Sequence, residues 1–463
     1  MRLKARAEAL WEGVWSSYWF LPGLMALGAL GLSLLLTRLD LALARRDVGL
    51  VGWPRVTSAQ GARALLTASA TAMASIAGVV FSVTIVTMSL ASNQLGPRLL
   101  RTFMRNKGNQ VVLGSFVAVA LYCLMTLQQV RGGDDPDQKM FVPQLSMLAA
   151  MIFTLCGLGV LIYFINHSAQ MIQAPNVIAA VSRDLRGAIE ESYPEPLEGR
   201  PGRDSHEAGS DSRDALEGQA RDLDPLKSAE VRAGTAGYLQ RIELDQIMEN
   251  AAKRGLVVKL ERRPGQYVDA ADAVLRVWPA EAVDARLRKD FSQTFTVGVQ
   301  RSLAQDPEYA LDQLVEIALR ALSPSLNDPF TAMHCVDRIG EALSFWAGRR
   351  MPSPFLVDDR GRLRVIGYPP GFCKAADQAF NQVRQNSVRS LAVMLRLLEA
   401  LARVAGHALR QEDRDCLDRQ ARAVYEQARA EARAEMDRAA VEERYTAFRE
   451  AATREPGGPP GRG

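Results

Sequence analysis

Residues 64–91 read ALLTASATAMASIAGVVFSVTIVTMSLA and contain no charged side chain. A helix needs about 20 apolar residues to cross roughly 30 Å of bilayer hydrocarbon. This segment exceeds that length, so a helix formed by it must tilt or project beyond the membrane. The sequence therefore predicts a transmembrane helix here, and the rest of the fold depends on how many such segments the chain holds.

Three further apolar runs without charged side chains lie before residue 167, at 18–37, 111–128 and 141–166. Each is close to the length of one membrane crossing. The rest of the chain is polar, so the whole-chain averages, 48% hydrophobic residues and a net charge of +4, hide two different regions. We predict a mainly α, polytopic membrane protein with four transmembrane helices in residues 1–167, followed by a cytosolic α+β region.

Charges that flank the apolar runs predict the orientation. Residues 2–6 and the loop at 98–107 are basic, whereas the loop at 132–137 is acidic. Cytoplasmic loops carry the excess of Lys and Arg in membrane proteins. Both termini are therefore predicted to be cytoplasmic, in a bacterial inner membrane, although the arginines within 38–63 argue for the opposite side.

Small and hydroxyl side chains form one face of the helix predicted at 64–91. This face consists of Thr67, Ala70, Thr71, Ala74, Ser75, Gly78 and Ser82. Small side chains let another helix approach closely, and hydroxyl groups hydrogen-bond across the contact. Packing against the chain's own spans is the favoured interpretation, and a symmetric contact or pore lining in a homo-oligomer is the alternative. The other predicted partner is the lipid bilayer.

Several classes of function are disfavoured by the composition. The four apolar runs hold no Asp, Glu, Lys, Arg or His, whereas proton-coupled transporters usually carry at least one. Acidic residues are interspersed among the basic ones, which predicts no nucleic-acid partner. The five cysteines are scattered without a C-x-x-C pair, so we expect no disulfide framework, no metal and no cofactor.

The polar region divides by composition into five segments. We predict a helical stalk at 168–193, a disordered linker at 194–230, a small β-barrel or sandwich unit at 231–300, a helical bundle at 301–450 with a β-hairpin near 355–366, and a disordered tail at 451–463. The linker composition cannot bury enough apolar surface to offset the entropy of ordering. Within the bundle we expect one helix at 379–405 and an exposed helix or partner-binding arm at 412–450.

Two Asp-Pro pairs mark helix starts in the bundle, at 306–307 and 328–329. Asp is a preferred N-cap and Pro a preferred first helical residue. Free N–H groups at a helix start can also bind a ligand. The residues of this candidate ligand or capping loop are Gln305, Asp306, Ser323, Asn327 and Asp328, and capping is the favoured interpretation.

Enzymatic motifs are missing from the sequence. It has no Gly-rich phosphate loop, no G-x-S-x-G elbow and no H-E-x-x-H. His334, Cys335 and Asp337 come closest to a reactive cluster, but adjacent helical positions point about 100° apart and cannot converge on one ion. We predict no catalytic residue. A hydrolase that uses Asp306, Asp328 or His334 is a distant third hypothesis.

Four motifs together carry a resemblance to a known family. They are Val80-Phe81-Ser82 with the stretch 92–98, the stretch 108–114, Gly237-Tyr238-Leu239-Gln240, and the long run from Gln305 to Ala332. The chain resembles, from Trp15 to about Leu401, the bacterial predicted membrane proteins of domain-of-unknown-function family 2254. That resemblance implies architecture and a bacterial membrane location, but no activity.

Two classes of function are compatible with these patterns. The first is a non-enzymatic, oligomeric channel or pore-like protein with a cytosolic sensing domain, which the overlong, hydroxyl-rich second span favours. The second is a membrane-anchored scaffold or signalling module without transport activity.

Overall fold

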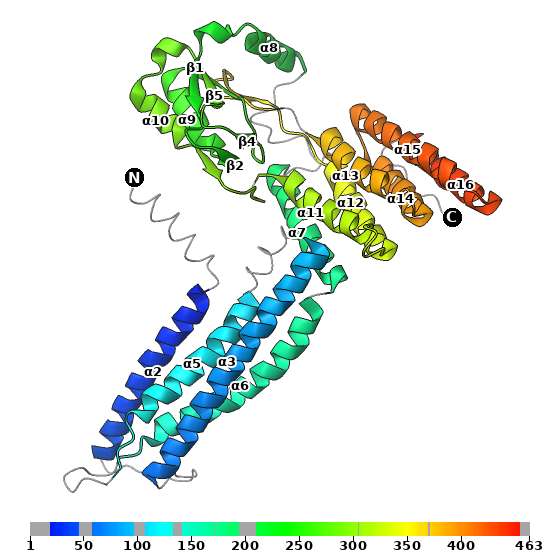
Figure 1. The fold of residues 1–463 in the computed structure, drawn as a ribbon. Helices are drawn as coiled ribbons and strands as arrows, with labels where there is room; N and C mark the ends of the chain where they lie inside the picture. The colour runs from blue at the N-terminus through cyan, green and yellow to red at the C-terminus, as the bar shows by residue number, and fades with distance from the viewer. Residues whose placement is uncertain are drawn as a thin grey trace. The chain divides into compact units, whose positions relative to one another are not determined.

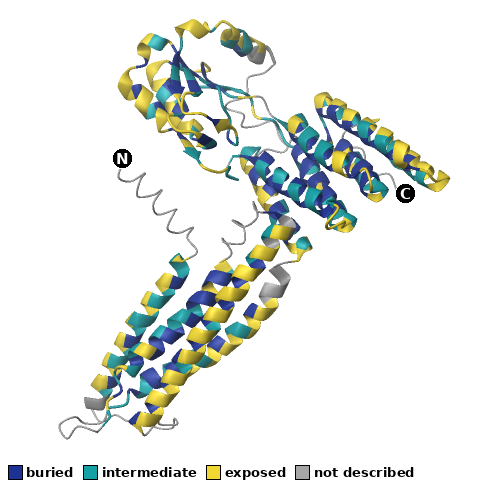
Figure 2. Cartoon of the chain, viewed as in Figure 1, coloured by how far each residue is buried: buried dark blue, intermediate teal, exposed yellow. Residues whose placement is uncertain are grey.

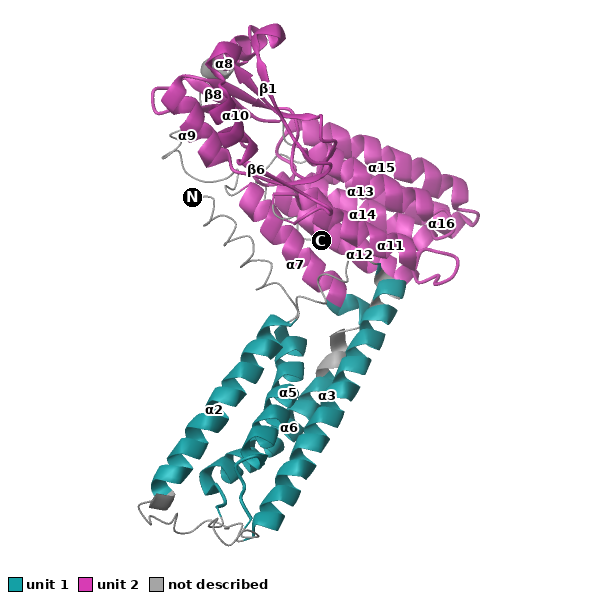
Figure 3. Ribbon diagram, turned by 60° about the vertical axis from the view of Figure 1, so that its left-hand side comes forward, with its two compact units in different colours: residues 1–176 teal, residues 177–463 magenta. Residues whose placement is uncertain are grey.

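The computed structural model describes residues 19–45, 58–96, 107–132, 141–171, 173–193, 210–303, 305–368 and 371–453. The chain divides into two compact units, unit 1 with residues 1–176 and unit 2 with residues 177–463 (Figure 3). Unit 1 holds the long apolar helices, and unit 2 holds two small sheets and the remaining helices (Figure 1).

Unit 1 contains four long helices: α2 (Phe20–Arg45), α3 (Ala59–Leu95), α5 (Lys107–Leu127) and α6 (Gln144–Met171). Each is long and apolar enough to cross a membrane. The predicted fold class, a mainly helical polytopic membrane protein with a following region of sheets and helices, is confirmed.

Helix α5 forms the centre of unit 1, where it packs against α2, α3 and α6. Phe116, Tyr122 and Cys123 of α5 are at most 1% exposed. At Gly114, an added Cβ would lie 2.9 Å from the Cα of Pro22, so the glycine permits the close approach of α2. Large apolar side chains elsewhere on the helices, such as Ile162, are exposed, as lipid-facing positions are. Figure 2 shows exposed positions along the helices of unit 1.

One expectation about the spans was wrong. We expected spans without Asp, Glu, Lys, Arg or His, but α2 continues past the apolar run and carries Asp40, which is 6% exposed. Its carboxylate accepts hydrogen bonds from the backbone N–H groups of Leu145 and Ser146, at 2.8 and 3.0 Å. Asp40 therefore caps the start of α6, because the first N–H groups of a helix lack partners within it.

Two small sheets form the β part of unit 2. The larger has the strand order β1 (Ala229–Arg232), β5 (Ala273–Trp278), β3 (Val257–Leu260), β8 (Leu363–Ile366) and β7 (Phe355–Val357). The smaller has the order β4 (Tyr267–Val268), β2 (Gly237–Ile242) and β6 (Phe295–Gly298). Two helices, α9 (Leu244–Arg254) and α10 (Ala285–Ser292), bury Ile247 and Phe291 in the same apolar core.

Strands β7 and β8 form a hairpin where one was predicted, near 355–366. The hairpin does not stay with the helices that surround it in the sequence. It joins the larger sheet, in which β8 pairs with β3 in parallel and Val365 lies opposite Val258. Val365 and Val258 are both 0% exposed, so the core of the β part needs this distant segment.

A short helix, α8 (Ser210–Arg221), lies within the range expected to be a disordered linker. Residues 194–209 are outside the described part of the chain. Leu216 of α8 is 6% exposed and packs against Leu363 and Ile366. The expectation of disorder was therefore wrong for residues 210–230, because the average composition hid one apolar anchor that a helix places on the sheet.

Unit 2 also contains α11 (Pro307–Ala321), α12 (Pro329–Ala347), α13 (Phe372–Asn386), α14 (Leu391–His407), α15 (Gln411–Glu431) and α16 (Glu435–Thr453). The single helix expected at 379–405 is wrong, since α13 and α14 are separated after Asn386. The hydroxyl of Ser387 donates to the carbonyl of Arg384 at 2.9 Å. Such side-chain bonds to nearby backbone compete with helix continuation.

The exposed arm expected at 412–450 is also wrong. Helices α15 and α16 pack against α13 and α14. Their sparse apolar side chains fall on the packed faces, and Leu417, Val424 and Phe448 are 0% exposed. Met436 of α16, by contrast, is 83% exposed. A narrow apolar stripe is therefore sufficient to hold two charged helices on the bundle.

Helix α7 (Ala174–Ser192) occupies the predicted stalk. Its apolar face is buried, at Val177, Ile178, Val181, Leu185, Ala188 and Ile189. Near its end, the guanidinium of Arg186 lies 4.0 Å from the centre of the Phe345 ring. From Val177 onward α7 is thus a packed element of unit 2 and not a free-standing stalk.

Candidate ligand-binding pocket

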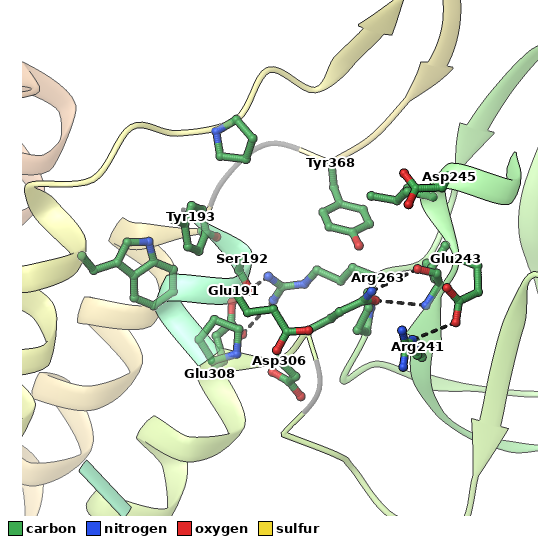
Figure 4. Close-up of a pocket in the computed structure, with 18 residues that line it drawn as sticks. Glu191, Ser192, Tyr193, Arg241, Glu243, Asp245, Arg263, Asp306, Glu308 and Tyr368 are labelled. Carbon is green, nitrogen blue, oxygen red and sulfur yellow. Dashed lines mark hydrogen bonds and ion pairs between the residues drawn. The ribbon is translucent and has the colours of Figure 1, made fainter. Parts of the chain in front are cut away.

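A pocket of about 430 Å³ opens within unit 2 (Figure 4). Its walls come from the end of α7, the junction of β2 with α9, the turn after β3, and the starts of α11 and α13, with Trp346 of α12 and Tyr368. This volume is in the range of sites for small molecules. We refer to it below as the unit 2 pocket.

Arg263 and Glu308 form a bidentate ion pair in the unit 2 pocket (Figure 4). The Nη1 to Oε1 distance is 2.6 Å and the Nη2 to Oε2 distance is 2.9 Å. An added Cβ at Gly371 would lie 3.1 Å from Glu308 Oε1, so the start of α13 closes over the pair. Two parallel charge-assisted hydrogen bonds fix both side chains.

Asp306 caps α11 and also anchors a charge network. Its Oδ1 accepts a hydrogen bond from the backbone N–H of Tyr309 at 3.2 Å. Arg301 donates two more hydrogen bonds to the same carboxylate, from Nη2 to Oδ1 at 3.0 Å and from Nε to Oδ2 at 2.9 Å. Arg301 Nη1 also donates to Asp312 at 2.6 Å. Although burial opposes its charge, these two carboxylates raise the pKa of Arg301. An added Cβ at Gly265 would lie only 2.2 Å from Asp306 Oδ2.

Gln305 connects the helical part of unit 2 to the smaller sheet. Its side-chain amide accepts the N–H of Ile242 at 3.0 Å and donates to the carbonyl of the same residue at 3.1 Å. The amide thus satisfies both backbone groups of Ile242 at the end of β2, as a neighbouring strand would. Gln305 adopts a φ of 58°, which is unusual for a residue other than glycine.

Aromatic side chains form another wall. The ring centroids of Tyr193 and Trp346 are 5.1 Å apart, and Phe372 packs edge-on against Trp346. Burial raises the pKa of Tyr193 to about 12 and also raises the pKa of Tyr368. Trp346 is 1% exposed, and its indole Nε1 has no hydrogen-bond acceptor among the described residues.

The structure separates the candidate loop residues into two groups. Gln305 and Asp306 line the unit 2 pocket. Ser323, Asn327 and Asp328 lie at the other end of α11, whose 15 residues span about 22 Å. Asp328 caps α12 there by accepting the N–H of Thr331 at 3.1 Å, and hydrogen bonds from Thr331 lower its pKa.

Several pocket residues were not singled out from the sequence. Glu191, Arg263, Trp346 and Tyr368 come from separate segments and share no motif. Next to Arg263, the dipeptide Pro264-Gly265 is a turn signal, and the close contact with Asp306 requires a glycine there.

The cluster of His334, Cys335 and Asp337 is part of a packed helix. Cys335 is 0% exposed, and burial raises the pKa of its thiol. Asp337 accepts a hydrogen bond from Arg403 at 2.8 Å. Within the described ranges, no group of three or more His, Cys, Asp or Glu side chains could hold a metal ion.

The small and hydroxyl face of α3 lies mainly at the surface of unit 1. Ala70 is buried, but the other members are exposed: Thr67, Thr71, Ala74, Ser75, Gly78 and Ser82. An added Cβ at Gly78 would have no atom within 4 Å. The face that packs against the described spans is a different one, with Leu66, Met73 and Val80 at most 1% exposed. We call the exposed set the α3 outer face.

Comparisons with known proteins place the chain among bacterial membrane proteins without an assigned activity. The model of the family described as "Predicted membrane protein (DUF2254)" matches residues 15–403. Uncharacterized proteins of Mycobacterium tuberculosis and Mycobacterium bovis are each 31% identical over 381 residues, which cover 81% of this chain and 70% of theirs. No solved structure matches the chain.

Proposed function

The chain belongs to the DUF2254 family of predicted membrane proteins, and we propose that it is a ligand-responsive membrane protein. In this proposal the unit 2 pocket binds a small molecule, and α7 transmits the bound state to the membrane helices. One observation carries it: α7 begins three residues after α6 ends, and its last turn, with Tyr193, forms part of the pocket wall. A helix is stiff enough to carry a displacement from one end to the other.

Contacts at the end of α7 support this role. The carbonyl of Tyr193 accepts Arg349 Nη1 at 3.0 Å, and Arg349 Nη2 lies 3.7 Å from Glu190. Arg349 also lies over the ring of Phe345, at 4.3 Å. A molecule that moves Tyr193 or Trp346 would change how these groups hold the helix.

Hydrogen exchange of the full chain in nanodiscs tests the proposal. Trp346→Leu opens the pocket wall, and Trp278→Leu is a matched control because Trp278 is 7% exposed in the β part of unit 2. We expect faster amide exchange in α7 and α6 for Trp346→Leu and not for the control. Unchanged exchange in α6 for both variants would refute transmission through α7.

A homo-oligomeric channel is the second candidate, and the α3 outer face supports it. Small and hydroxyl side chains with open space around them suit a close contact with a second copy, or a pore lining. Liposomes that contain the protein should then leak ions, and Thr71→Val should alter that flux while the native mass stays unchanged. Liposomes as tight as protein-free ones, for cations, anions and osmotic shock, would leave a membrane-anchored signalling module without transport.

The location that we propose is the bacterial inner membrane with unit 2 in the cytoplasm. The basic residues at 2–6 and 98–107 support this orientation. A cytoplasm-dependent reporter fused after Gly463 should be active. Activity of a periplasm-specific reporter at the same position would show that unit 2 lies in the periplasm.

A further inference from the structure

Charges in the unit 2 pocket do not balance. Most acids there have a partner: Glu308 pairs with Arg263, Asp306 with Arg301, and Glu243 with Arg241 at 2.8 Å. Glu191 and Asp245 also line the pocket, and neither makes an ion pair with a described residue. Both are exposed at the rim, so they can meet an incoming ligand.

The end of α7 adds to this negative potential. The last turn of a helix carries partial negative charge, and acids are unfavourable there. Helix α7 nevertheless ends with two of them and has no basic residue in its last turn. Glu190 is balanced by Arg186 at 3.3 Å and Arg349 at 3.7 Å, whereas Glu191 lines the pocket without such a partner in the described part of the chain.

Positive helix ends at the pocket are already matched by acids. Asp306 caps α11, and the Glu308 carboxylate lies against the start of α13 at Gly371. Asp245 lies in the first turn of α9, at the positive end of that helix. The unmatched feature is therefore a negative rim, and a cation would balance it.

Aromatic rings and one buried donor specify the ligand further. Tyr193, Trp346 and Tyr368 line the same pocket, and the faces of such rings attract ammonium groups. The buried indole N–H of Trp346 lacks an acceptor among the described residues, although buried donors are nearly always paired. An oxygen on the ligand would supply that acceptor.

We propose that the unit 2 pocket binds a small organic cation that carries an oxygen acceptor, the chemistry of an amino alcohol. This inference rests on the proposed function, because it names the ligand of the same pocket. Binding of the cation beside Glu191 would stabilise the unfavourable end of α7, which gives the ligand a physical means to act on that helix.

Calorimetry on the full chain in nanodiscs, at constant ionic strength, tests the ligand class. The probes are choline and ethanolamine, tetramethylammonium as a cation without oxygen, and succinate and inorganic phosphate as anions. We expect choline or ethanolamine to bind, and Glu191→Gln and Asp245→Asn each to weaken binding about fivefold or more. Asp290→Asn on α10 is the matched control, since Asp290 does not line the pocket, and it should bind as the wild type does.

Trp346→Phe tests the donor separately. It keeps an aromatic face but removes the indole N–H, so the preference for choline over tetramethylammonium should disappear. Equal binding of these two cations by the wild-type chain would refute the oxygen acceptor.

Two other results would overturn the inference. Binding of succinate or phosphate in preference to the cations would reverse the ligand class and leave the ligand-responsive function standing. Failure of every cation to bind below millimolar concentration would also refute an organic cation as the ligand. Transmission through α7 is judged independently, by the hydrogen exchange of Trp346→Leu.

Discussion

The Asp40 carboxylate accepts two hydrogen bonds from Ser146, one from its backbone N–H at 3.0 Å and one from its hydroxyl at 2.8 Å. Asp40 comes from the end of α2, and Ser146 from the start of α6. Both side chains are at most 6% exposed. A single carboxylate thus joins the first and last spans of unit 1 and satisfies N–H groups that have no partner within α6.

Removing this acceptor should destabilise unit 1. Asp40→Ala leaves buried N–H groups without partners, which costs about 1–3 kcal/mol. Asp40→Asn keeps one oxygen and should cost less. Ser58→Ala, which removes the exposed cap at Gly61 of α3, is a milder control at about 1 kcal/mol. Thermal unfolding in detergent measures all three, and equal midpoints for Asp40→Ala and wild type would show that the contact contributes nothing.

Gly78→Leu should weaken self-association without weakening the fold. Space is open around Gly78, so leucine there disturbs no contact within the described chain. Gly157→Leu is the contrasting variant, because an added Cβ would lie 2.9 Å from the sulfur of Met73. Native mass and unfolding midpoint together separate the effects: Gly78→Leu should change the first and Gly157→Leu the second. A monomeric wild type would end the proposal of a homo-oligomer.

Breaking the Arg263–Glu308 pair should be costly in unit 2. Their side chains are 21% and 11% exposed. Removal of Arg263 leaves the Glu308 carboxylate nearly buried and without its two short hydrogen bonds, with Lys374 Nζ 3.9 Å away as the remaining partner. Arg263→Met should therefore destabilise unit 2 by about 3–5 kcal/mol. The double variant Arg263→Met with Glu308→Met should be more stable than Arg263→Met alone. A double variant whose loss equals the sum of the two single losses would show that the charges are not coupled.

Leu216→Ala should destabilise the β part although it lies in the region that composition marks as disordered. Leu216 contacts Leu363 and Ile366, and a buried Leu→Ala change costs about 2–5 kcal/mol. Leu226, which is 93% exposed, provides the control Leu226→Ala. The urea midpoint and the hydrogen exchange of β8 measure the stability of both variants. Equal stability of the two variants would mean that α8 does not dock.

Tyr193 should make stability fall at high pH. Its pKa is raised by burial from 10.0 to about 12, so the folded state favours the neutral phenol. This contribution is fully present below pH 10 and is lost as pH rises through about 12. Tyr193→Phe cannot ionise, so its urea midpoint should decrease less than that of the wild type over this interval. If the urea midpoints of the variant and the wild type fall in parallel as pH rises, the loss of stability comes from other groups.

Local patterns determined much of the fold. The four spans were readable because hydrocarbon thickness sets a length that an apolar run either reaches or does not. The starts of α11 and α12 were readable because Asp and Pro act within one helical turn. The break at Ser387 and the packing of Leu216 were not readable, since both depend on what lies beside them.

By itself, the sequence determined that this is a membrane protein with four spans and a following region of sheets and helices. Tertiary structure alone decided which side of α3 faces outward, because Ala70 and Gly78 belong to the same small-residue pattern and only packing separates them. It also decided the pocket. Glu191, Arg263 and Trp346 lie on segments far apart in the chain, and no local interaction records that folding brings them around one cavity.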